Sequence, residues 1–182
     1  MVPIAQSFRV GRTLWFSLFV STVLFLAMLK YFRAAGLPHQ SVTSTMVIAL
    51  AAVAVPTAVA SLLLPRRILA MAVRRLEIKI VDEVGEPVGS FRESAPVRRV
   101  VADPEAAVRG AMAEYQRSLM VGMALAESIA LYGFMLGYQG APRPVFLPFF
   151  VLCWALQVTK IPKPERVTRA IESATGAECR LP

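Results

Sequence analysis

Long apolar runs are the feature of this sequence that most limits its fold. Three of them, Thr13–Phe32, Val42–Leu64 and Leu119–Tyr138, reach the length of about 20 residues that a helix needs to cross a bilayer. A fourth, Val145–Val158, is shorter and contains Pro148, so its length alone also fits a re-entrant or interfacial segment. A mean hydropathy of +0.57 with only 18% charged residues is unlike a soluble domain of this size. The sequence therefore predicts a polytopic membrane protein.

The distribution of positive charge predicts the orientation of the chain. Of the 20 Lys and Arg residues, 17 precede the first run, lie between residues 65 and 118, or follow from residue 160 onward. Cytoplasmic loops retain Lys and Arg, so both termini and the middle segment are expected in the cytoplasm of a bacterium, with the chain in its inner (plasma) membrane. The same count favours a fourth crossing at 145–158, because otherwise the basic tail would lie on the opposite side. We assign the net charge of +8 to topology and to anionic lipid head groups rather than to nucleic acid.

These observations predict an all-α membrane protein with four transmembrane helices in two hairpins and a cytoplasmic segment between them. The expected parts are a first hairpin at 1–64, a basic cytoplasmic segment leading into a long helix at 65–118, a second hairpin at 119–161, and a cytoplasmic tail at 162–182.

Two signals describe the cytoplasmic segment further. Residues 77–92 show a brief alternation followed by Gly85, Pro87 and Gly89, which fits a small β-hairpin or an irregular loop equally well. Further on, Asp103, Pro104 and Glu105 have the order of an N-cap, a first helical proline and a first-turn acid. Since no proline follows before Tyr138, we expect one helix of about 35 residues, near 50 Å long at 1.5 Å per residue.

Glu127 is the only acidic residue inside the four apolar runs. A charged carboxylate near the bilayer centre costs about 2.5 kcal/mol or more, so this side chain should be protonated, paired, or beside a watery cavity. It either binds and releases a proton or sodium ion, or it makes a hydrogen bond to a neighbouring helix. Without a basic residue or second acid deep in the runs, it would be a poor proton relay.

The third run also contains a row of small residues beside Glu127. With spacings of four, four, three and four, the row would let another helix approach closely. Its members are Gly122, Ala126, Ala130, Gly133 and Gly137.

A family resemblance accompanies this pattern. The segment GMALAESIALYGFML, residues 122–136, resembles the carboxylate-bearing outer helix of the c subunit of rotary ATP synthases. The matching residues are Gly122, Ala124, Leu125, Glu127, Tyr132 and Gly133. By this resemblance Glu127 would occupy the ion-carrying position. The whole chain also resembles four-span bacterial membrane proteins whose third span reads A-L-A-E-x-x-A-L-Y-G.

Two functional hypotheses follow. The first is a membrane scaffold or assembly protein in which Glu127 is a buried packing contact, with a second copy or another membrane protein as its partner. The second is a protein that handles protons or sodium at Glu127. We expect no enzyme, since no Ser/His/Asp, His/Cys or paired-carboxylate set is evident. The spacing of the two cysteines predicts no metal site, and no motif calls for a cofactor.

Overall fold

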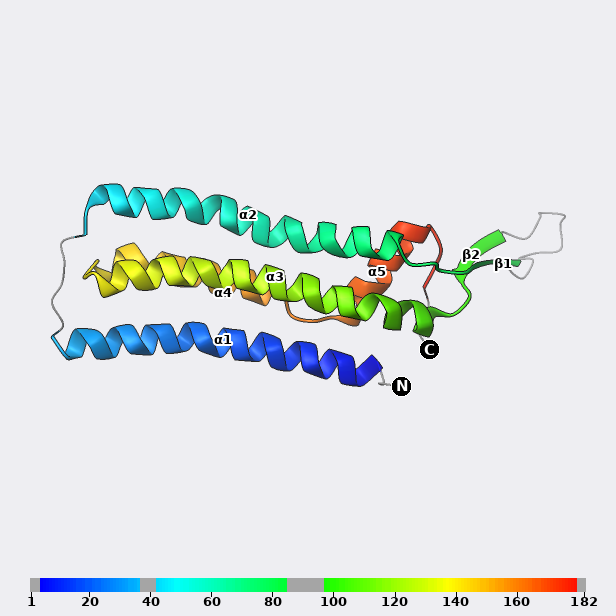
Figure 1. Cartoon of the computed structure of the whole chain (residues 1–182), viewed down its shortest axis with the longest axis horizontal. Helices are drawn as coiled ribbons and strands as arrows, with labels where there is room; N and C mark the ends of the chain where they lie inside the picture. Colours follow the sequence, from blue (N-terminus) through cyan, green and yellow to red (C-terminus); the bar gives the residue numbers. More distant parts are fainter. Residues whose placement is uncertain (1–3, 37–41, 85–96, 180–182) are drawn as a thin grey trace, which may run out of the picture. The chain divides into compact units, whose positions relative to one another are not determined.

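The structure is a computed structural model that describes residues 4–36, 42–84 and 97–179. It is about 80% helical. In order, the elements of these residues are α1 (Ile4–Ala34), α2 (Ser44–Arg74), β1 (Ile80–Val84), β2 (Val97–Val101), α3 (Pro104–Tyr138), α4 (Arg143–Val158) and α5 (Pro164–Thr175). Figure 1 labels each of them.

Three of these helices could cross a membrane. Within the described ranges, α1 from Phe8 onward, α2 and α3 are each long and apolar enough, while α4 is an apolar helix of 16 residues. The prediction of long apolar helices is therefore confirmed for three candidate spans, and the fourth crossing stays a prediction. The expected helix of 35 residues is confirmed, because α3 runs unbroken from Pro104 to Tyr138.

The chain divides into two compact units. Unit 1 consists of Met1–Phe8, Arg66–Arg117 and Lys163–Pro182, and unit 2 of Arg9–Pro65 and Ser118–Pro162. The helices α2 and α3 pass from one unit into the other, so the expected first hairpin does not end its helix at residue 64.

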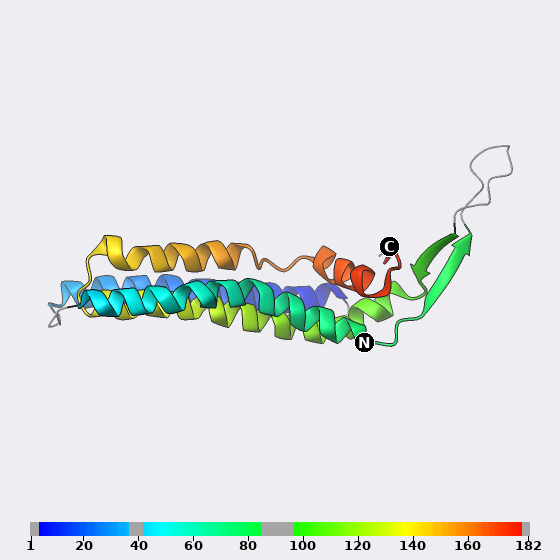
Figure 2. The ribbon, with the colours of Figure 1, turned by 90° about the horizontal axis from the view of Figure 1, so that it is seen from above.

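Within unit 2 the helices run alongside one another (Figure 1, Figure 2). The central helix is α3, since 44% of its most apolar stretch is buried, against 11% for α1 and for α2. The buried apolar cluster is centred on side chains of α3 and α4, including Ile129, Leu136, Phe146 and Phe150. The outward side chains of α1 and α2 are apolar as well, which suits contact with lipid.

Unit 1 combines the helix ends with a small sheet. Strands β1 and β2 pair antiparallel, with Ile80 opposite Val101 and Val84 opposite Val97 (Figure 2). Val100 forms a parallel bridge with Glu178. The sequence left open whether residues 77–92 form a β-hairpin or an irregular loop. The structure places β1 in this range, but its partner β2 lies beyond it. Gly85, Pro87 and Gly89 lie outside the described residues.

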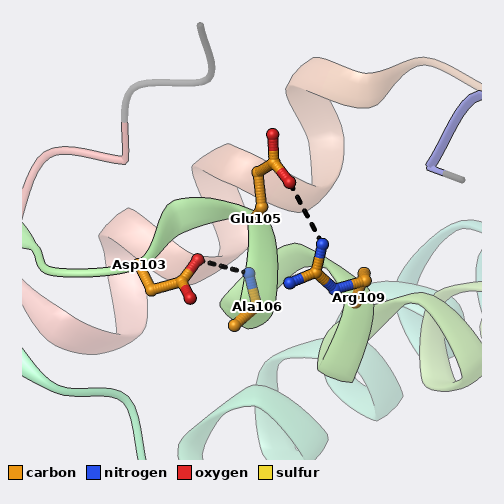
Figure 3. A network of polar contacts seen from close by, with 4 residues as sticks. All are labelled: Asp103, Glu105, Ala106 and Arg109. Atoms are coloured by element: carbon orange, nitrogen blue, oxygen red, sulfur yellow. Dashed lines mark hydrogen bonds and ion pairs between the residues drawn. The ribbon is translucent and has the colours of Figure 1, made fainter. Parts of the chain in front are cut away.

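The start of α3 follows the predicted capping pattern. The backbone N–H of Ala106 donates to Asp103 Oδ1 at 2.8 Å, and Arg109 forms an ion pair with Glu105 at 3.1 Å (Figure 3). Both acids face the positive end of the helix dipole. Below them Val108 and Ala111 are buried with Val167 and Ile171 of α5, and these residues form the core of unit 1.

Candidate functional site

Glu127 lies on α3 inside unit 2, where it is half-buried. The hydroxyl group of Ser21 on α1 donates a hydrogen bond to Glu127 Oε1. The carboxyl group thus has a polar partner on a neighbouring helix. In hydrocarbon surroundings no water competes for either group, so the hydrogen bond stabilises the contact between the two helices.

The Ser21 hydroxyl has two acceptors for its single proton. Its oxygen is also 2.8 Å from the carbonyl oxygen of Leu18. An ionised Glu127 needs the Ser21 proton, whereas a protonated Glu127 donates to Ser21 Oγ and leaves the Ser21 proton for Leu18. The contact therefore has one complete hydrogen-bond pattern for each protonation state of Glu127.

The row of small residues lies at close contacts between helices. A Cβ atom on Gly133 would be 2.8 Å from Phe149 Cβ and 3.0 Å from the carbonyl oxygen of Phe146, both on α4. A Cβ atom on Gly137 would be 2.8 Å from Leu29 of α1. Ala126 and Ala130 are fully buried. All five residues of the row, Gly122 included, are buried against other parts of unit 2.

Gly122 belongs to a second polar contact, which involves Lys160. A Cβ atom at Gly122 would be 2.7 Å from Pro65 Cγ and 3.0 Å from Lys160 Cε. Pro65 has no N–H for the carbonyl group of Ser61, four residues earlier in α2. The ammonium group of Lys160 donates to that carbonyl oxygen at 3.0 Å, and the Ser61 hydroxyl donates to the carbonyl oxygen of Gly122 at 3.0 Å.

Lys160 is only 6% exposed. The sequence suggested that it begins the basic cytoplasmic tail, but the structure places it inside unit 2. It lies two residues after the end of α4. The physical reason for its burial is the carbonyl group that Pro65 leaves without an intrahelical donor.

Indole groups add two further bonds between α1 and α4. Trp15 Nε1 donates to the carbonyl oxygen of Gln157 at 2.9 Å, and Trp154 Nε1 donates to Thr22 Oγ1 at 2.9 Å. Thr22 and Gln157 are both fully buried. The two tryptophans thus hold α1 against α4.

Arg33 caps the C-terminal end of α3. Its Nη2 donates to the carbonyl oxygen of Ala141 and, at 3.4 Å, to that of Gly137. Its guanidinium carbon lies 4.8 Å from the centroid of the Phe146 ring. A cation at this end of α3 complements the negative end of the helix dipole.

Sequence reasoning found Glu127 and the small row but missed the partners around them. Ser21, Gln157 and Lys160 each stand in or beside an apolar run without any motif. One signal was present for Lys160, because Pro65 follows Ser61 by four residues and frees its carbonyl.

No cluster of metal ligands is formed by the part of the chain that the structure describes. No three His, Cys, Asp or Glu side chains gather there as metal ligands. Cys153 in unit 2 and Cys179 in unit 1 are both free and buried.

A comparison of the chain with known protein families, curated proteins and solved structures found no match. The resemblance of the third span to the c subunit therefore stays a prediction, and the site is interpreted from its own geometry.

Proposed function

We propose that this chain is an integral membrane scaffold or interaction protein, in which Glu127 is a polar packing contact that fixes α1 on α3. The hydrogen bond from Ser21 to Glu127 is the observation that carries this proposal. In such a protein the acid serves to set the geometry of the helices, and the surface that they present recruits a partner.

The other polar contacts of unit 2 support the same role. Each connects two different segments: Ser61 connects α2 to α3, Trp154 connects α4 to α1, and Lys160 connects the end of α4 to α2. Helices in lipid gain little from apolar burial, so polar bonds and small residues decide how they associate. A chain whose buried polar side chains mostly bond between helices is built to hold one arrangement.

We further propose that α4 is a fourth span and that both termini are cytoplasmic in a bacterial inner membrane. The contacts of α4 support this, since Phe146 lies beside Gly137 and Lys160 beside Gly122, so α4 follows α3 over much of its apolar length. Reporter fusions at residues 90, 140 and 182 would test the topology. A cytoplasmic reporter should be active at 90 and 182 and inactive at 140, and activity at 140 would contradict it.

Anionic lipid head groups are the expected partner at the cytoplasmic face. Arg66, Arg67 and Arg74 are exposed on the last turns of α2, and Arg75 is exposed directly after it. Each basic residue near an anionic surface is worth about 1 kcal/mol. Replacing these four residues with Gln should abolish any rise in melting temperature when phosphatidylglycerol replaces phosphatidylcholine in nanodiscs. An unchanged rise would exclude them as the lipid contact.

The packing role is tested by a double-mutant cycle. Ser21→Ala, Glu127→Gln and the double variant should show a coupling energy of about 0.6 kcal/mol in the free energy of unfolding, the average for such bonds in membranes. Trp fluorescence measures it in unit 2, because both tryptophans of the chain lie there. A coupling of zero would remove the contact as a determinant of packing.

The scaffold role needs a second experiment, because packing alone does not imply a partner. Purification in a mild detergent should recover the chain with a defined second protein or as a homo-oligomer. Recovery of the bare monomer from gently solubilised membranes would count against a scaffold.

A second candidate function is proton or sodium handling at Glu127. The two hydrogen-bond patterns of Ser21 favour it, because they satisfy both protonation states of the carboxyl group. Under this function a carbodiimide should label Glu127 as the pH falls, sodium should protect it, and Glu127→Gln should lose ion flux in vesicles while remaining folded. Equal flux in the wild type and the variant would leave only the packing role.

A further inference from the structure

Gln157 differs from the other buried polar side chains of unit 2. It is 0% exposed, and neither Nε2 nor Oε1 has a hydrogen-bond partner among the described residues. Leaving a buried amide without partners is unfavourable, so such a group normally bonds to protein or to an ordered water molecule. Its surroundings therefore indicate what it binds.

The antiparallel contacts of α3 and α4 place Gln157 at the level of Glu127. Cys153 lies beside the backbone of Ala130, and Lys160 lies beside Gly122. Between these two contacts, the middle of segment 153–160 falls between Leu156 and Gln157, and the middle of the α3 segment falls at Ala126, next to Glu127. The Cys153 thiol group is within electrostatic reach of both Glu127 and Lys160.

Helix α1 contacts both Gln157 and Glu127, through side chains about two turns apart. Trp15 bonds to the backbone carbonyl group of Gln157, and Ser21 bonds to Glu127. Gln157 is thus enclosed by α1, α3 and α4, with an acid at its own level and the Lys160 ammonium group one turn further along. The facing residues of α3 are small, namely Gly122, Ala126 and Ala130.

We propose that Gln157 binds an internal water molecule, which joins Glu127 and Lys160 into one polar layer across unit 2. An amide supplies two donors and an acceptor, so it bridges an acid on one side and an ammonium group on the other through water. Buried waters commonly make about three hydrogen bonds to polar groups that would otherwise lack partners. The proposal rests on the position given to Glu127 in the proposed function.

The test uses the full chain in lipid nanodiscs and begins with the variant Gln157→Leu. If Gln157 holds water, the variant loses hydrogen bonds and its melting temperature should fall by about 2–6 °C. If the amide has no partner, an apolar side chain of similar size is favoured, and the melting temperature should be unchanged or higher. That second result would overturn the proposal.

Gln139→Leu is the matched control, because Gln139 is a half-buried glutamine directly after the C-terminal end of α3. Its melting temperature should change by no more than about 2 °C. An equal fall in both variants would mean that the loss of any glutamine explains the effect, and the proposal would fail.

A measurement on the wild-type chain covers the case in which Gln157→Leu does not fold. In solid-state NMR, magnetisation from water should reach the side-chain amide of Gln157, assigned through the Leu156–Gln157 pair, which occurs once in the sequence. Absence of this transfer would overturn the water site. Neither experiment alters Ser21 or Glu127, so their failure leaves the proposed packing role to its own double-mutant cycle.

Discussion

The core of unit 1 is apolar, with buried side chains such as Val73, Val108, Val167 and Ile171, whereas unit 2 also buries Thr22, Ser61, Gln157 and Lys160 among its helices. The ion pairs of unit 1, such as Arg109 with Glu105, are on its surface. In unit 2 the side chains of Thr22, Ser61 and Lys160 bond between helices.

The difference between the units follows from the surroundings that each fits. In water, burying apolar side chains provides the main driving force, and charged groups remain outside. In lipid, an apolar side chain gains little when it moves from lipid to a neighbouring helix, so close contacts of small residues and polar bonds decide the packing. The two units should therefore respond differently to the same kind of substitution.

The largest expected effect is the loss of an apolar side chain from unit 1. Ile171→Ala should lower the free energy of unfolding by roughly 2–4 kcal/mol, because Ile171 is fully buried in its core. Labelling of Cys179 during denaturation, in a Cys153→Ala background, measures this in unit 1. Ile48→Ala, at an exposed position of α2 in unit 2, should cost well under half as much. Equal losses of unfolding free energy for the two variants would mean that the two units do not differ in how they depend on apolar side chains.

The second effect is overpacking in unit 2. Gly133→Ala should cost about 1–3 kcal/mol, because its new methyl group would meet the carbonyl oxygen of Phe146 and force α3 and α4 apart. Trp fluorescence during denaturation measures it.

Gly110 provides the matched control on the same helix. A Cβ atom there would be 3.7 Å from the side chain of Leu76, which is an ordinary contact in unit 1. Gly110→Ala should therefore be neutral or stabilising by up to about 1 kcal/mol, because alanine favours the helix. Destabilisation by both variants would mean that close helix contact is not special to unit 2.

The third effect concerns Lys160. Lys160→Met keeps the length of the side chain but removes the donor to the Ser61 carbonyl oxygen, and should cost about 1–3 kcal/mol. Adding Pro65→Ala restores an N–H to α2 for that carbonyl, so the double variant should recover part of the loss. If it recovers none, the freed carbonyl is not the reason that Lys160 is buried.

The smallest effect is on the reactivity of Cys179 in unit 1. Burial raises the pKa of the Cys179 thiol, and the nearby Glu172 carboxylate raises it further. The thiolate is the reactive form, so labelling in the native state should be slow near pH 7 and increase as the pH rises. Glu172→Gln should lower the pKa and speed labelling at a fixed pH. An unchanged rate would mean that access alone limits the reaction.

Much of the fold could be predicted from local patterns. The apolar runs predicted the three candidate spans, and Asp103 with Pro104 predicted the start of α3. Strand β2 was missed because the sequence VRRVV has no clear alternation or turn signal of its own, and its paired residues in β1 lie 13 to 21 positions earlier in the chain. Helix α2 continues through Pro65 to Arg74, beyond residue 64 where the apolar run ends.

The sequence by itself determined where the long apolar runs lie, which face of α3 carries small residues, and that a single acidic residue lies within the runs. Only the tertiary structure decided what that acid and its neighbours bond to: Ser21 with Glu127, Lys160 with Ser61, and the enclosure of Gln157. The physical reason is the separation along the chain over which each effect acts. Hydropathy and helix caps act within a few residues, whereas these polar contacts join residues from 61 to more than 100 positions apart, and no local pattern encodes such pairs.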